Sequence, residues 1–204
     1  TSVAGALGAA LLREVGALVS GDQPLLCRTY VNVRPHYSLP PHSLGPYIGW
    51  VDTLLEAGKS FWEDARRYKA AAAELMHEGR HLWVSASWPA RVYEFRVLLE
   101  SMRKIWASPS RPAHMLSLSF GLSNRGSFRL EAPARRVTAV HFVRQQRGFG
   151  QEFFELNVCT VNGTLCLTLT YYDLLCPDNV AEGLLDRVLQ QIVTAAEADT
   201  PAQQ

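Results

Sequence analysis

Six histidines are the residues of this chain best suited to acid–base or metal chemistry. An imidazole titrates near neutral pH and also binds transition metals, so its neighbours decide which role it takes. His77 and His81 lie four positions apart, a spacing that would place both rings on one face of a helix, as two metal ligands could be placed. Gly79 lies between them and no third ligand is evident in the sequence, so a solvated helix end is the favoured interpretation.

The other histidines belong to no recognised catalytic motif. His36 and His42 fall in a proline-rich stretch, where they could line a pocket or lie on the surface. His141 falls in a predicted strand, where a hydrogen-bonded structural histidine is the usual outcome. The chain contains no G-x-S-x-G, H-E-x-x-H or G-x-x-x-x-G-K-[ST] motif, and the Gly-Phe-Gly at 148–150 is too short to cradle a phosphate. We therefore predict no catalytic residue and no metal site in this chain.

Four cysteines show no C-x-x-C spacing, which argues against a zinc site and suits a reducing compartment. We therefore expect a cytoplasmic protein. Cys159 and Cys166 allow two interpretations: two small buried residues, or a cross-strand disulfide that only an oxidising environment would maintain.

The composition predicts a globular domain or a large lobe with a full core, because 48% of the 204 residues are hydrophobic and 19% are charged. Twenty basic and nineteen acidic side chains give a formal charge of +1, so no long-range field draws the chain to nucleic acid or to an anionic membrane. No apolar run approaches the roughly 20 residues that a membrane-spanning helix needs. We expect no nucleic-acid partner and no membrane span.

The strongest structural signal is a β-hairpin over residues 152–172. Two alternating runs flank Asn162 and Gly163, the residue types of a two-residue type I′ turn, so that Val161 would face Thr164. The register then pairs, on a mainly polar face, Cys159 with Cys166, Asn157 with Thr168 and Glu155 with Thr170. The other face is apolar and carries Phe154, Leu156, Val158, Thr160, Leu165, Leu167, Leu169 and Tyr171. We therefore predict a sheet with a single core face.

The remaining periodicity predicts a sheet backed by helices. Helices are expected over 2–18, from 59 or 60 to before 79, from 89 or 90 to 106, and from 177 to before 199, the first being small-residue-rich and closely packed. Strands are expected over 25–33, 47–55, 115–122 and 137–145, with an irregular loop over 35–49. The later strands are expected to form an antiparallel meander. The predicted fold is α/β (α+β) with a mixed, mainly antiparallel sheet; residues 1–198 form one lobe and 199–204 a disordered tail.

A short segment after the 115–122 strand carries a family resemblance. The sequence LSNRG at 122–126 indicates a turn, because Asn and Gly tolerate positive φ. Together with VTAVHF at 137–142, the hairpin and the C-terminal helix, it resembles the C-terminal lobe of CoA-dependent acyltransferases. This group includes condensation domains, alcohol O-acetyltransferases and polyketide-associated acyltransferases. YVNVRP at 30–35 and LGPYIG at 44–49 resemble the segment that begins the same lobe.

The resemblance implies one lobe of a two-lobed, chloramphenicol-acetyltransferase-like fold, in which acyl donor and acceptor enter a cleft from opposite sides. It implies acyl transfer from a CoA or carrier-protein thioester to an alcohol or amine, without a tightly bound cofactor. The general base of the family is the second histidine of H-H-x-x-x-D-G in the N-terminal lobe, and this chain lacks that motif. A partner lobe, in the same protein or in a separate chain, would have to supply the base, and this chain alone would be inactive.

The resemblance also places Ser123, Asn124, Arg125 and Gly126 near the substrate channel. Arg125 occupies a position where the family commonly has an apolar residue, which departs from a conventional acyl pocket. The segment is thus either a turn alone or a turn at the cleft. The chain is either an acyltransferase lobe or a catalytically dead homologue that serves as an interaction or scaffolding module; a third reading is a small-molecule binder without chemistry.

Overall fold

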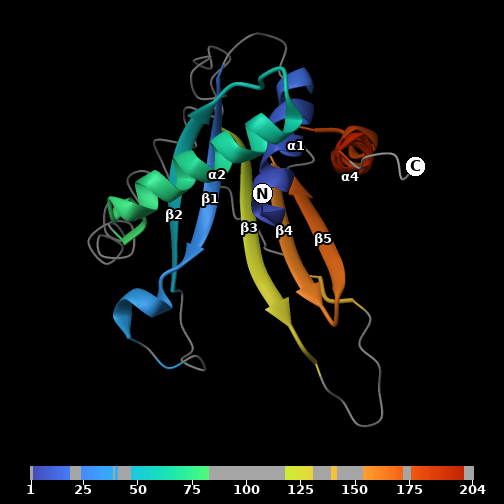
Figure 1. Ribbon diagram of the computed structural model, residues 1–204. Helices are drawn as coiled ribbons and strands as arrows, with labels where there is room; N and C mark the ends of the chain where they lie inside the picture. Colours follow the sequence, from blue (N-terminus) through green and yellow to red (C-terminus); the bar gives the residue numbers. More distant parts are fainter. Residues whose placement is uncertain are drawn as a thin grey trace, which may run out of the picture.

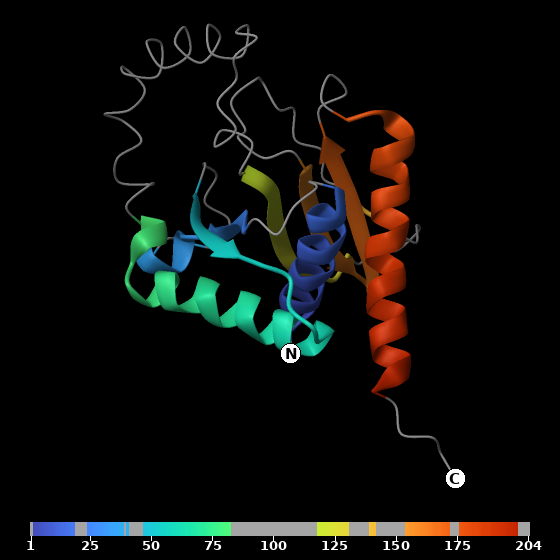
Figure 2. The ribbon, with the colours of Figure 1, turned by 90° about the horizontal axis from the view of Figure 1, so that it is seen from above.

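The computed structural model describes residues 2–18, 24–38, 40, 47–82, 118–130, 139–141, 154–171 and 176–199. These ranges form a five-stranded sheet in the order β2-β1-β3-β4-β5, with α1, α2 and α4 packed together on one face (Figures 1 and 2). The predicted mixed sheet backed by helices is confirmed. The predicted helix at 89 or 90 to 106 lies outside the described ranges, as does the predicted tail beyond Asp199.

Helix α1 (Val3–Leu18) begins at the predicted N-cap region, where the Ser2 hydroxyl oxygen accepts the Gly5 N–H at 3.2 Å. It is buried along most of its length and packs between α2 (Phe61–His77) and α4 (Asp178–Ala198). Small residues make this packing possible, since Gly8 lies directly against the ring of Tyr68. The predicted close packing of this helix is confirmed.

The sheet combines antiparallel edges with a parallel centre. β1 (Leu25–Asn32) pairs antiparallel with β2 (Ile48–Leu55) and parallel with β3 (Leu118–Phe128). β3 also pairs parallel with β4 (Phe154–Val161), so the predicted antiparallel meander is wrong at this point. The segment between β3 and β4 is long enough for the crossover that parallel strands require. Of the strand predicted over 137–145, only 139–141 are described, and they belong to no strand.

The hairpin of β4 and β5 (Thr164–Tyr171) has the predicted register, with Val161 opposite Thr164. Its turn residues Asn162 and Gly163 have φ of 50° and 85°, as a type I′ turn requires. The expected single core face is wrong, because β4 is also buried on its polar face. Alternation tells which side chains share a face but does not reveal whether a second face is covered.

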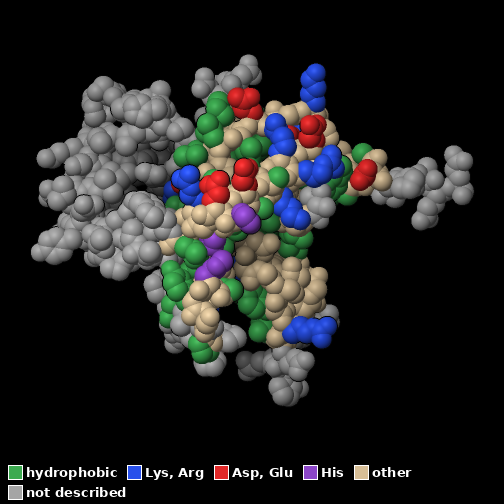
Figure 3. Space-filling view, turned by 60° about the vertical axis from the view of Figure 1, so that its left-hand side comes forward, with side chains coloured by type: hydrophobic (Ala, Val, Ile, Leu, Met, Phe, Trp, Pro, Cys, Tyr) green, Lys and Arg blue, Asp and Glu red, His purple; other side chains and the backbone are tan. Residues whose placement is uncertain are grey.

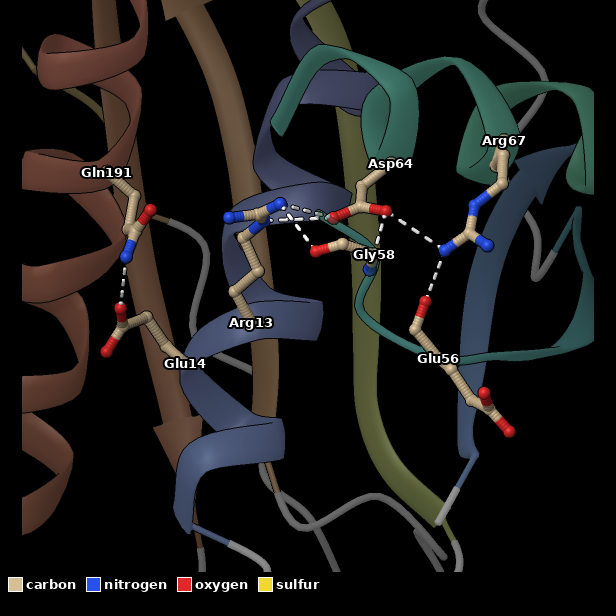
Figure 4. A network of polar contacts seen from close by, with 7 residues as sticks. All are labelled: Arg13, Glu14, Glu56, Gly58, Asp64, Arg67 and Gln191. Atoms are coloured by element: carbon tan, nitrogen blue, oxygen red, sulfur yellow. Dashed lines mark hydrogen bonds and ion pairs between the residues drawn. The ribbon is translucent and has the colours of Figure 1, made fainter. Parts of the chain in front are cut away.

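An acidic side chain at the start of α2 joins α1 to the loop after β2 (Figure 4). The Asp64 carboxylate is fully buried and accepts hydrogen bonds from Arg13 Nε at 2.9 Å and from the Gly58 N–H at 2.9 Å. Arg67 donates to the same carboxylate and to the Glu56 carbonyl oxygen. This network fixes the entry of α2 against α1.

A second polar contact joins α1 to α4. Glu14 accepts hydrogen bonds from Arg187 Nε at 2.8 Å and from Gln191 Nε2 at 2.9 Å. All four cysteines are buried free thiols, so Cys159 and Cys166 are small buried residues and not a disulfide. None of the helices in the described ranges is long and apolar enough to cross a membrane.

Candidate functional site

The carboxyl end of β3 forms a β-bulge, where the sequence pattern of Asn and Gly predicts a turn.

 β3 stops pairing with β1 at Ser123, and the two strands diverge beyond that point (Figure 1), but β3 still pairs with β4 as far as Phe128. Between Asn124 and Ser127, β3 contains one more residue than the facing part of β4. Gly126 has a φ of +81°, and its N–H donates to Asn124 Oδ1 at 3.0 Å. The predicted turn is therefore wrong, because a bulge uses the same tolerance of positive φ without reversing the chain.

The bulge brings Arg125 to the face of the sheet opposite the helices. Arg125 Nη2 donates to Asn157 Oδ1 at 3.3 Å, and Asn157 Nδ2 donates to Glu155 Oε1 at 3.2 Å. Ser123 is the register partner of Asn157 on the neighbouring strand. Asn157 and Glu155 are 2% and 1% exposed, whereas Arg125 is exposed. We call Ser123, Arg125, Asn157 and Glu155 the bulge cluster.

The bulge cluster is suited to binding and orienting an oxygen-rich group. A guanidinium presents several N–H donors in a planar fork, which matches carboxylate, phosphate or carbonyl oxygens. The buried Asn157 accepts from one nitrogen of the guanidinium and is itself held by Glu155, while Arg125 is exposed to solvent. Burial raises the pKa of the neighbouring Cys159 thiol, and Cys166 adds to the rise, so this thiol is not poised as a nucleophile.

The four residues predicted for the substrate channel divide into two roles. Ser123 and Arg125 belong to the bulge cluster, whereas Asn124 and Gly126 shape the backbone that aims Arg125. A role at a substrate channel stays a prediction for all four. Sequence reasoning missed Asn157 and Glu155 as site residues. The hairpin register placed both on one face, but no pattern in the sequence signalled that this face would be buried.

The structure pairs His81 with His36 and not with His77. Helix α2 ends at His77, and Gly79, with a φ of +74°, redirects the chain before His81. The Nε2 atoms of His36 and His81 lie 3.0 Å apart. His81 is 1% exposed, and burial, followed by the proximity of His36, lowers its pKa. Figure 3 shows histidine side chains, in purple, gathered on one face of the molecule.

The remaining histidine predictions have mixed outcomes. His141 Nδ1 lies 3.2 Å from Thr168 Oγ1, so this histidine is hydrogen-bonded as expected, although it belongs to no strand. His42 and residues 148–150 lie outside the described ranges. Across the part of the chain that the structure describes, no group of three or more His, Cys, Asp or Glu side chains could hold a metal ion.

No protein-family model and no curated protein matches this sequence, but solved structures do. The epimerization domain from the third module of tyrocidine synthetase B matches with a TM-score of 0.56 at 12% identity, over 97% of this chain and 42% of that chain. A structure describing condensation domain-mediated chain release from the enacyloxin polyketide synthase matches with a TM-score of 0.54 at 12% identity, over 100% of this chain and 38% of that chain.

These likenesses establish the fold as that of a condensation-domain-like lobe. The chain spans 42% and 38% of the length of the two matched chains. At 12% identity the likeness concerns the fold alone, and the activity has to be argued from the site.

Proposed function

We propose that this chain is the C-terminal lobe of an acyltransferase of the condensation-domain type. It would act with an N-terminal lobe, in the same protein or in a separate chain, to move an acyl group from a CoA or carrier-protein thioester to an alcohol or amine. The strongest support is the extent of the two structural matches. They cover 97% and 100% of this chain but less than half of each matched chain. That proportion is expected of one lobe of a two-lobed fold.

In this proposal the chain binds and orients substrate, and the partner lobe supplies the histidine that removes the proton. The bulge cluster supports a binding role, because the exposed guanidinium donates to the buried Asn157 amide, which in turn contacts the buried Glu155 carboxylate. Arg125 would donate to a carbonyl or phosphate oxygen of the thioester substrate. No tightly bound cofactor is needed. We expect the cytoplasm as the compartment, because the spacing of the four cysteines suits a reducing environment.

A second candidate is a catalytically dead homologue that retains the fold as an interaction or scaffolding module. One observation favours it: Arg125 stands where the family resemblance implies an apolar residue. The absence of H-H-x-x-x-D-G from this chain is compatible with both candidates, because the motif belongs to the other lobe. A fold can persist after its chemistry is lost, because the core and the reactive groups are different residues.

The decisive experiment is an acyl-transfer assay on the two-lobed protein, with the coding sequence upstream of Thr1 included. We expect an H-H-x-x-x-D-G motif in that region and thioester-dependent transfer that needs both lobes. Residues 1–204 alone should show no turnover. A degenerate upstream motif together with no transfer would exclude the enzyme proposal and favour the scaffold. Transfer by residues 1–204 alone would show that the assignment of the base to a partner lobe is wrong.

Arg125→Ala tests the proposed binding role in the same assay. Loss of a charge-assisted hydrogen bond costs about 1.5–3 kcal/mol, so the KM for the thioester should rise roughly tenfold or more. Arg125→Ala also removes the donor to the buried Asn157 Oδ1, so some loss of stability is expected, although Asn157 keeps its contact with Glu155. Circular dichroism checks that the variant remains folded. Arg129→Ala is the matched control, because Arg129 is an exposed arginine just beyond β3. Equal KM values for both variants would remove Arg125 from substrate binding.

A further inference from the structure

The histidine pair is held by two elements that are distant in sequence. His36 is exposed and belongs to the 3-10 helix η1 (Arg34–Tyr37) after β1, whereas His81 is buried and follows the turn after α2. The carbonyl oxygen of His81 lies against Gly49 of β2, so closely that a Cβ at Gly49 would approach it to 2.2 Å. The backbone on both sides of the pair is thus positioned by regular structure.

The geometry of the pair differs from that of an in-line hydrogen bond. With a ring radius of about 1.15 Å, a linear N–H···N contact at this nitrogen separation would place the ring centroids about 5.3 Å apart. The observed centroid separation is 4.6 Å, with an interplanar angle of 61°. The shorter separation means that the ring axes are tilted off the line between the two nitrogens, and it is compatible with two axes that tilt to the same side and meet at one point. For symmetric convergence that point lies about 2.1–2.2 Å from each Nε2, close to the length of a metal–imidazole bond.

The same geometry indicates which metals fit. In this symmetric arrangement the lines from the meeting point to the two nitrogens enclose roughly 90°, whereas tetrahedral zinc would need nitrogens about 3.3–3.4 Å apart, more than the observed 3.0 Å. An angle near 90° is typical of tetragonal Cu²⁺ or Ni²⁺, and Cu²⁺ binds nitrogen ligands most tightly in the divalent series. His81 Nδ1 is buried and has no hydrogen-bond partner among the described residues. No described residue donates to Nδ1, which would otherwise hold the ring proton on Nε2.

We propose that His36 and His81 form a two-histidine site for a divalent transition metal of tetragonal geometry, with Cu²⁺ the preferred ion. The described part of the chain provides no third side-chain ligand, so water completes the coordination. Solvent reaches the site through the exposed ring of His36. A bound ion would tie η1 to the end of α2 and would therefore stabilise the folded chain by mass action.

The test is a titration of the tag-free chain with Cu²⁺ at pH 7.5, monitored by calorimetry and by electron paramagnetic resonance. We expect an axial Cu²⁺ signal with coupling to two imidazole nitrogens at one equivalent, and a higher melting temperature with Cu²⁺ than without. Zn²⁺ should bind more weakly. His36→Ala should weaken this binding at least tenfold and abolish the thermal shift. His77→Ala, which removes an exposed histidine four positions from His81, should change neither.

The His36→Gln variant provides an independent check, because glutamine can keep a hydrogen bond to His81 but is a poor copper ligand. It should also lose the signal, and it replaces His36→Ala if circular dichroism shows that the alanine variant is unfolded. Unchanged affinity in both variants would overturn the proposal, as would no binding at micromolar Cu²⁺ or a spectrum without two-nitrogen coupling. Tighter binding of Zn²⁺ than of Cu²⁺ would overturn the tetragonal geometry.

Discussion

At the scale of single residues, the stability of this fold depends most on a few buried polar side chains. Asp64 and Glu155 are 0% and 1% exposed, and each has partners that replace the water lost on burial. Removing one partner of such a contact leaves the other without compensation, which costs more than the contact itself contributes. Sequence alone places these residues on elements, but their partners come from other parts of the chain.

Asp64→Ala should lower the free energy of unfolding by about 2–4 kcal/mol, because it leaves Arg13 and the Gly58 N–H without their acceptor. This expected loss of stability is smaller than the full cost of breaking a buried ion pair, because the Arg13 and Arg67 side chains are partly exposed. Urea unfolding followed by circular dichroism measures the change. Glu63→Ala, at the exposed neighbouring position, should cost less than about 1 kcal/mol. Similar losses for the two variants would contradict the importance of the Asp64 network.

His81 should make the stability of the fold depend on pH. Burial, and then the proximity of His36, lowers the pKa of His81 in the folded chain, whereas the unfolded value is about 6.5. The unfolded state therefore binds more protons as the pH falls below about 6.5. The free energy of unfolding should decrease in that range, by at most about 1.4 kcal/mol per pH unit for this one group.

Urea unfolding at pH 7.5, 6.5 and 5.5 tests this prediction. The His81→Gln variant should lose the part of the pH dependence below about 6.5 that the parent chain shows. His77→Gln, at an exposed position, should keep it. The prediction is wrong if the parent chain and His81→Gln have parallel pH profiles.

At the scale of elements, α1 is the helix on which the others assemble. It packs against both α2 and α4, and nine of its residues are buried. Gly8 and Gly16 lie in the same helix but have different surroundings. Substituting each by alanine therefore distinguishes the effect of packing from the effect of helix propensity. A Cβ at Gly8 would lie 2.5 Å from the Tyr68 ring, whereas at Gly16 the nearest atom, on Leu25, is 3.8 Å away.

Gly8→Ala should therefore destabilise the fold by about 1–3 kcal/mol, even though alanine favours a helix by about 1 kcal/mol. Tyr68 cannot move aside easily, because its ring stacks on Phe120 and its hydroxyl bonds Thr29 Oγ1 at 2.7 Å. Gly16→Ala should stabilise by about 0.5–1 kcal/mol. Chemical denaturation of both variants measures the signs, and effects of the same sign would refute the packing argument.

At the scale of the whole molecule, the proposed lobe requires a surface for its partner. Large apolar side chains are exposed around the far end of the hairpin, where Phe128, Leu130 and Leu165 are 37%, 42% and 42% exposed. Asn162 links this region through hydrogen bonds to the backbone of Phe128 and Leu130. Exposed apolar residues that lie close together are typical of interaction surfaces.

The isolated chain should therefore associate with itself or precipitate, and a partner lobe should restore a single defined complex. Size-exclusion chromatography with light scattering, on the chain alone and co-expressed with the upstream lobe, measures this. Leu130→Lys combined with Leu165→Lys should reduce self-association if these side chains are responsible. A monodisperse monomer in the absence of any partner would contradict the prediction.

Local patterns in the sequence determined the hairpin register, the limits of α1, α2 and α4, and the strands β1 and β2. These features depend on periodicity, on caps and on turn residues, all of which act within a few positions of one another. The sequence also indicated a tolerance of positive φ in segment 122–126, and Gly126 has a φ of +81°. Its use as a bulge was not predictable, because the same backbone conformation serves a turn or a bulge, and the neighbouring strand decides between them.

Only the tertiary structure decided the parallel pairing of β3 with β4, the burial of Glu155 and Asn157, and the contact between His36 and His81. Each of these joins segments that lie far apart in the chain or depends on what covers a surface. Hydrophobic periodicity contains no information about which distant segment will pack against a given face. The elements of this protein are therefore determined by its sequence locally, whereas the bulge cluster and the histidine pair exist only because the complete fold brings their residues together.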